Sequence, residues 1–221
     1  DYRPPVGGTT DYKPPVGGTT DYRPPVGGTT DYKPPVGGVA NLPTGPANSF
    51  QPNQVAGFTP NQMAAFKPEQ IAQLAPNAVG AFNSQQVQAL PPEAFAGMGA
   101  AQMKAMPPTA MAGMGAQQLN QLAPATFKEM TPQQVKALPP TAFAGMTPTQ
   151  LGQLSTTSVK AMATQDIALL TPEAVAGMKL AQAKSMTTAQ LGALTKEQVA
   201  KMSASVLNGL SAAQKAAIAK P

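Results

Sequence analysis

The side chains that could do chemistry in this 221-residue chain include carboxylates, lysines, methionines and glutamines, but no histidine and no cysteine. Without histidine the chain lacks the most common general base and metal ligand, and without cysteine it lacks disulfides and thiolate metal sites. The acidic residues beyond residue 40 recur at no fixed offset that would pair two of them as in a glycosidase. They are Glu69, Glu93, Glu129, Asp166, Glu173 and Glu197. Because phosphate-loop and nucleophile motifs are also missing, we expect no enzyme, no cofactor and no metal site.

Methionine recurs along the chain at places that phenylalanine and leucine fill elsewhere, as in Leu90, Met98 and Met106. A row of thioethers could bind copper or form an adaptable peptide-binding surface. Interchange with phenylalanine and leucine is instead typical of a hydrophobic core. We therefore predict that these methionines are buried.

Glutamine follows a spacing of sixteen residues, interrupted once by Asp166. The series is Gln54, Gln70, Gln86, Gln102, Gln118, Gln134, Gln150, Gln182, Gln198 and Gln214. A row of amides could form a hydrogen-bonding face for a glycan or for ice. Capping of short helices is the interpretation that we favour.

These residues belong to a unit of eight residues, called an octad here, that begins at Phe50 and repeats to the end of the chain. Its consensus is Φ-T-P-x-Q-Φ-x-A, where Φ is apolar, and residues 170–177, LTPEAVAG, are a close copy. Apolar residues fill position 1, as in Phe58 and Phe66, and position 6, as in Val55 and Val87. A short fixed period predicts a repeat architecture in which each unit stacks on others.

The octad pattern favours helix over strand. Successive apolar residues are separated by five and then three positions, and both odd intervals would place them on opposite faces of a strand. Threonine or serine at position 2 suits a helix N-cap, proline at position 3 suits the first helical residue, and glutamine at position 5 completes a capping box. Proline every eight residues excludes a continuous helix. We therefore predict helices of one to two turns separated by sharp corners.

Helices this short are not stable alone, so each must bury its apolar side chains against neighbours. The predicted fold is an all-α solenoid over residues 50–221. Because glutamine at position 5 alternates with alanine or another small residue from octad to octad, we predict two octads per coil, and a weaker 32-residue echo also allows four. The core residues on which we rely are Phe58, Phe66, Val87, Leu90, Phe95, Phe127, Val135, Leu138 and Phe143.

Residues 1–40 are a different segment, built from four near-identical decapeptides of the form D-Y-[RK]-P-P-V-G-G-T-T. Residues 41–49 form a junction rich in proline and glycine. Tandem prolines favour extended backbone, and one valine and one tyrosine per decapeptide cannot bury enough surface to fold alone. The segment is therefore either a semi-extended linker or an arm that becomes ordered in a groove on a neighbouring subunit.

We favour the docking arm because tyrosine, a basic residue, a proline pair and a glycine pair recur at fixed positions, which a spacer does not require. Every tyrosine of the chain lies in this arm. The predicted anchors are Tyr2, Tyr12, Tyr22, Tyr32, Pro4, Pro14, Pro24 and Pro34.

Octads such as MTPQQVKA and LTPEAVAG resemble the octapeptide repeat arrays (LTPxQVxA type) of large bacterial surface and secreted proteins. That resemblance implies an extracellular structural or adhesive role. The LTPxxV opening is also similar to transcription-activator-like effector repeats, which bind DNA. Those units are about four times longer and carry a base-reading pair that is missing here, so we do not expect nucleic-acid binding.

The composition agrees with a structural protein. The formal net charge is only +5, and no apolar run approaches the ~18 residues that a membrane helix needs. Because the first residue is aspartate, we expect a processed chain or a fragment. We predict a self-assembling subunit of a bacterial extracellular filament or matrix fibre, located outside the cell or on its surface. The alternative is the stalk or ligand-binding module of a monomeric surface adhesin.

Overall fold

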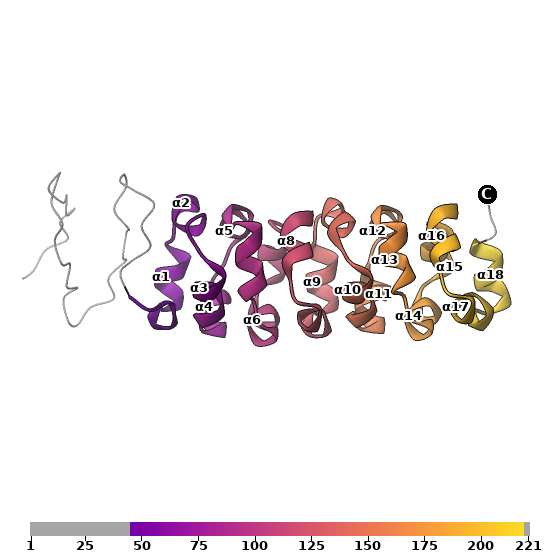
Figure 1. Ribbon diagram of the computed structural model, residues 1–221, viewed down its shortest axis with the longest axis horizontal. Helices are drawn as coiled ribbons and strands as arrows, with labels where there is room; N and C mark the ends of the chain where they lie inside the picture. The colour runs from indigo at the N-terminus through magenta and orange to yellow at the C-terminus, as the bar shows by residue number, and fades with distance from the viewer. Residues whose placement is uncertain (1–44, 219–221) are drawn as a thin grey trace, which may run out of the picture. The chain divides into compact units, whose positions relative to one another are not determined.

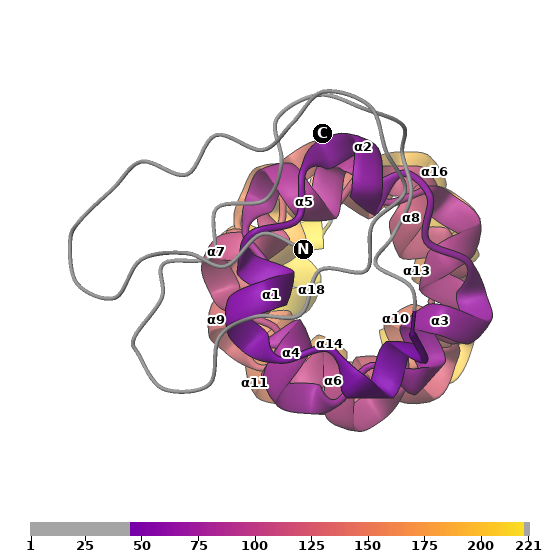
Figure 2. The ribbon, with the colours of Figure 1, turned by 90° about the vertical axis from the view of Figure 1, so that its left-hand side faces the viewer.

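The computed structural model of the chain describes residues 45–218, and these residues form a solenoid of short helices without any strand. The helices follow one another along a single axis in chain order (Figure 1). Viewed along that axis, successive helices lie around a ring (Figure 2). The prediction of an all-α repeat solenoid with one-to-two-turn helices is confirmed for this part of the chain. The arm over residues 1–40 lies outside the described residues, so the boundary at residue 40 stays a prediction.

The helices recur with the octads. The first part of the solenoid contains η1 (Ala47–Ser49), α1 (Pro52–Ala56), α2 (Pro60–Met63), α3 (Pro68–Gln73), α4 (Pro76–Val79), α5 (Ser84–Ala89), η2 (Pro92–Gly97), α6 (Ala100–Ala105) and α7 (Pro108–Met111). The middle contains α8 (Ala116–Gln121), η3 (Pro124–Glu129), α9 (Pro132–Ala137), η4 (Pro140–Gly145), α10 (Pro148–Gln153), α11 (Thr156–Ala161) and α12 (Thr164–Leu169). The last part contains α13 (Pro172–Ala176), α14 (Leu180–Ser185), α15 (Thr188–Gly192), α16 (Lys196–Lys201), α17 (Ala204–Gly209) and α18 (Ala212–Ile218).

Helix α9 shows how the octad sequence sets the local structure. Thr131 at position 2 is extended, with φ −74° and ψ 158°, and its side chain accepts a hydrogen bond from the backbone N–H of Gln134. Pro132 follows as the first helical residue, where the missing N–H costs no hydrogen bond. Leu138 at position 1 of the next octad is again extended, with φ −61° and ψ 138°, and ends the helix. Two consecutive extended residues therefore form each corner, as the cap chemistry predicts.

The prediction of two octads per coil is wrong. Helices that lie three octads apart pack on each other throughout the described solenoid, for example α9 on α11 and α13 on α16. Side-chain hydrogen bonds connect residues 28 and 31 positions apart, as from Gln134 to Met106 and Met103. One coil therefore takes between three and four octads, because 24 residues are three octads and 32 are four.

The sixteen-residue alternation has another cause. Because helices three octads apart stack, most stacked pairs join one glutamine octad to one octad with a small residue at position 5; α2 on α5 and α15 on α18, which carry glutamine in both octads, are exceptions. In the small-residue octads, glycine at position 8 lets the backbone approach the helix below very closely. An added Cβ at Gly145 would lie 1.9 Å from the carbonyl oxygen of Ala116. The alternation of octads therefore reflects two kinds of contact between coils: hydrogen bonds from glutamine and close backbone packing at glycine.

The core is one continuous column of apolar side chains from positions 1 and 6. All nine predicted core residues are buried, and Val87, Phe95, Phe127, Val135 and Phe143 are 0 % exposed. In the first coil, Phe50 and Phe58 meet edge to face with ring centroids 5.4 Å apart. Burial of two such side chains per octad, at about 1.5–3 kcal/mol each, is the main force that holds the short helices together.

Candidate functional site

A row of buried glutamines lies between the coils of this solenoid. Gln134 shows the arrangement. Its Oε1 accepts a hydrogen bond from the backbone N–H of Thr131 at 2.8 Å, which caps its own helix. Its Nε2 donates to the carbonyl oxygens of Met103 and Met106, each at 2.7 Å, in the coil below. One amide therefore caps a helix and also joins two coils.

The carbonyl of Met106 explains the second role of the Gln134 amide. Met106 is extended and lies between α6 and α7, so neither helix supplies a donor for its carbonyl. A buried carbonyl without a donor costs about 1–3 kcal/mol. The glutamine of the coil above supplies that donor.

The same bonds recur along the axis, and we call these residues the glutamine ladder. Each member is at most 6 % exposed and donates to carbonyls 28 and 31 residues earlier. The ladder consists of Gln86, Gln102, Gln118, Gln134, Gln150, Gln182, Gln190 and Gln198. Helix capping by position 5 is confirmed, and the alternative of a glycan- or ice-binding face is wrong for these residues because their amides are buried and bonded.

Asp166 interrupts the ladder. Its Oδ2 accepts from the backbone N–H of Ala163 at 2.6 Å and so keeps the cap. A carboxylate has no donor for the coil below, and no side chain of the described residues donates to the carbonyl of Leu138, which lies 28 positions earlier. Burial raises the pKa of the Asp166 carboxyl, and the hydrogen bond from Ala163 lowers it by less.

Replacing Asp166 by glutamine should therefore stabilise the solenoid. Two new hydrogen bonds, to the carbonyls of Val135 and Leu138, should raise the free energy of unfolding by about 1–2 kcal/mol in total. Because the folded state raises the pKa of Asp166, the wild-type carboxyl favours folding at low pH, and that contribution is lost as the pH rises through the folded pKa. The advantage of glutamine should thus grow as the pH rises from below about 4 to neutrality.

Urea unfolding at pH 3 and pH 7 would measure this difference, with Asp166→Asn as the control. Asparagine removes the charge but is one methylene shorter, so it should recover only part of the gain at neutral pH. A glutamine variant that is no more stable than wild type at pH 7 would show that the hydrogen bonds missing at Asp166 do not lower the free energy of unfolding.

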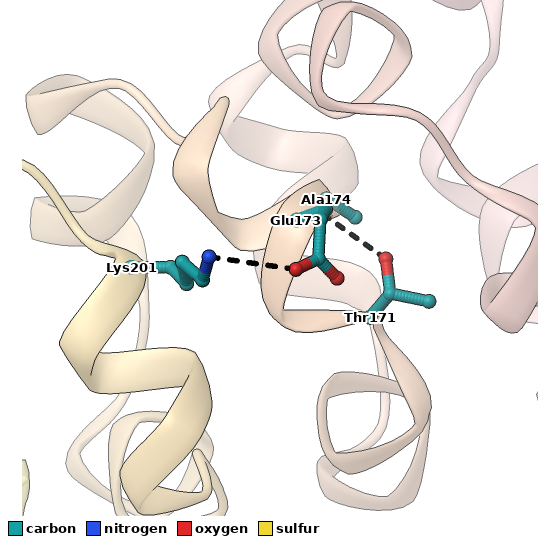
Figure 3. A network of polar contacts seen from close by, with 4 residues as sticks. All are labelled: Thr171, Glu173, Ala174 and Lys201. Carbon is teal, nitrogen blue, oxygen red and sulfur yellow. Dashed lines mark hydrogen bonds and ion pairs between the residues drawn. The ribbon is translucent and has the colours of Figure 1, made fainter.

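The charged side chains of the described residues form few contacts with one another. Within residues 45–218 no group of three or more acidic side chains could hold a metal ion. Lys201 and Glu173 make the one ion pair of these residues, at 3.6 Å between α16 and α13, beside the Thr171 cap of α13 (Figure 3). Both side chains are more than half exposed, so the pair contributes at most about 1 kcal/mol.

The methionines are core residues, as predicted. Met103, Met111 and Met114 are 0 % exposed and lie in the same apolar column as the phenylalanines. Their thioethers do not form a surface for copper or a peptide.

Two open hollows lie on the surface of the middle coils. The larger is lined by residues such as Glu93, Asn120 and Glu173, together with the backbone around Gly145. Both hollows are wide open to solvent. No helix of the described residues is long and apolar enough to cross a membrane.

The predicted assembly residues, the four tyrosines and four prolines of the arm, lie outside the described residues and stay predictions. The local sequence pattern does not predict the second hydrogen-bonding role of the glutamines or the close contacts made by glycine at position 8. The only sequence signal for both was the alternation between octads.

Compared with known proteins, the chain matches no protein-family model and no curated protein sequence. The likeness to bacterial octapeptide arrays therefore stays a resemblance between motifs.

Proposed function

We propose that this chain is a structural, self-assembling subunit of a bacterial extracellular filament or matrix fibre, without catalytic activity. The observation that carries the proposal is the coil-to-coil contact, which repeats from one end of the described solenoid to the other. Each coil presents amide donors toward the previous coil and carbonyl acceptors toward the next. The two ends of such a stack are unlike, and a contact between unlike ends does not close on itself, so it produces filaments.

Residues 1–40 would then dock on neighbouring subunits. An extended arm of forty residues reaches on the order of 120 Å, at ~3.1 Å per residue, so it can reach across to a neighbouring subunit. Tyrosine would serve as the buried anchor and the proline pairs would reduce the entropy lost on binding.

Negative-stain electron microscopy of the purified chain tests assembly directly. Regular filaments with a subunit repeat are expected. Monodisperse rods would favour the second candidate, the stalk or ligand-binding module of a surface adhesin, for which the open hollow around Asn120 is the observation in favour.

Replacing Tyr2, Tyr12, Tyr22 and Tyr32 by serine tests the arm while keeping length and charge. We expect fewer and shorter filaments with an unchanged helical circular dichroism spectrum, because the anchors are removed and the solenoid is not. The matched control replaces Val6, Val16, Val26 and Val36 of the same decapeptides by threonine, which keeps their size. Filaments of normal length from the tyrosine variant would show that the arm is only a linker and does not dock through its tyrosines.

A further inference from the structure

The glutamine ladder leaves donors at one end of the solenoid and acceptors at the other. In the first described coil, Gln54 and Gln62 accept the backbone N–H of their N-cap residues through Oε1. Their Nε2 groups donate to no acceptor among residues 45–218. In the last coil, the carbonyls of Val199, Met202, Leu207 and Leu210 receive no side-chain donor from the described residues. These donors and acceptors occupy the same octad positions as the bonded groups of the glutamine ladder, in which the amide of position 5 donates to carbonyls of positions 6 and 1.

The last coil also leaves apolar surface incompletely covered. Position-6 residues of the interior coils, such as Val135 and Leu151, are 0 % exposed. Val199 and Leu207 occupy the same position and are half-buried. A further coil placed on this end would cover them as the interior coils cover their equivalents.

The octad register of the two ends is complementary. In the sequence register Ile218, the last residue of α18, stands at position 1 of an octad, and Ala47–Ser49 occupy positions 6 to 8 of an octad. Suppose that these two segments belong to one shared octad, so that the octad count continues from the first copy into the second. Gln54 of the second copy then lies 31 residues after Val199 and 28 residues after Met202. Gln198 has the same spacing from Ile167 and Leu170, to whose carbonyls it donates. Gln54 also falls sixteen positions after Gln214, so the alternation of octads continues across the junction.

We propose that a second copy of this chain docks on the last coil in this register. Gln54 of the docked copy donates to the carbonyls of Val199 and Met202. Its Gln62 donates to those of Leu207 and Leu210. The inference rests on the proposed function, and it specifies the face, the partner and the register of the contact between subunits.

Replacing Gln54 and Gln62 by glutamate tests the donors in the full chain. Glutamate keeps the acceptor that caps the helix, but its carboxylate cannot donate and repels a carbonyl. The critical concentration for filaments should rise at least about tenfold, the change that 1.4 kcal/mol produces. The control, Asn53→Asp with Asn61→Asp, places the same charge on exposed neighbouring residues and should assemble as wild type does.

Disulfide trapping tests the register, because the natural chain contains no cysteine. Within the solenoid, Ser185 packs on Thr156, 29 residues earlier, and its Oγ lies 3.1 Å from the carbonyl oxygen of Thr156. In the proposed contact Gly57 of the docked copy takes the place of Ser185, and Ala204 takes the place of Thr156. Filaments of the Gly57→Cys/Ala204→Cys variant should give a series of linked oligomers on a non-reducing gel. The Thr156→Cys/Ser185→Cys variant should link within one chain, and Gly57→Cys/Ala212→Cys, one octad out of register, should link far less.

The outcomes separate the two proposals. Wild-type chains that form no filaments under any condition would contradict the proposed function. Wild-type filaments that persist in the glutamate variant and never link through residues 57 and 204 would overturn this inference and leave the filament proposal intact. Residues 1–44 of the same chain or another surface would then occupy the end.

Discussion

Replacing Gln134 by glutamate should lower the free energy of unfolding by about 3–5 kcal/mol at neutral pH. The substitution keeps the acceptor for the N–H of Thr131 but removes the donor to Met103 and Met106, and it places a buried carboxylate against two carbonyl oxygens that lie 2.7 Å from the present amide nitrogen. Burial should raise the pKa of the new carboxyl, so the loss should shrink as the pH falls through that value, where the protonated group regains one donor.

The neighbouring Gln133→Glu variant is the matched control. Gln133 is exposed on the same turn of α9, so the same chemical change there should alter stability by less than about 0.5 kcal/mol. Urea unfolding of both variants at pH 4 and pH 7 would measure the difference. Equal losses at the two positions would show that the stability of α9 depends on its cap alone, and not on the bonds between coils.

Helix capping by glutamine could be predicted from the sequence because both partners lie within four residues. The threonine of position 2 and the glutamine of position 5 are fixed by local helix geometry alone, as Thr131 and Gln134 show. The amide nitrogen of the same side chain bonds to residues 28 and 31 positions away. That distance depends on how many octads close one coil, which no local rule sets.

The number of octads per coil was predicted wrongly for a physical reason. A sixteen-residue alternation suggests two units per coil only if equal octads stack on each other. Here unlike octads stack, because the packed helices are an odd number of octads apart, as α3 and η2 are. The backbone turns through the angle that its two extended corner residues allow, and the sequence pattern of side chains does not report that angle.

The burial of core residues can be predicted from the sequence better than any other property, and the contacts at the ends of the solenoid can be predicted least. The apolar period alone identifies Val135 and Leu138 as core, and the structure buries both. The end faces of the solenoid become visible only when each donor is matched to its acceptor, since Gln54 in the first coil and Gln198 in a later one stand at the same octad position and are both followed by Val-Ala. At the two ends, whether the glutamine has an acceptor depends on its place in the stack and not on its octad.

A second large effect is expected from Gly145→Ala. An ideal Cβ at Gly145 would lie 1.9 Å from the oxygen, 2.5 Å from the carbon and 2.8 Å from the Cα of Ala116 in the coil below. These atoms are backbone, so no side-chain rotation can relieve the overlap and the two coils must separate locally. The hydrogen bond from Asn120 Nδ2 to the carbonyl of Gly145, now 3.0 Å, would be disturbed as well. We expect a loss of about 3 kcal/mol, at the upper end of the usual cost of overpacking.

Gly192→Ala is the control for the intrinsic effect of adding a methyl group to a helical glycine. The nearest atom to its added Cβ is the carbonyl oxygen of Ala217 at 3.5 Å, an ordinary contact. This variant should be unchanged or more stable by about 0.5–1 kcal/mol, because alanine favours helix more than glycine does. Thermal and urea unfolding of both variants would give the comparison. If both glycines tolerate alanine equally, the close approach of small-residue octads does not set the spacing of the coils, and the alternation of octads then depends on the glutamine bonds alone.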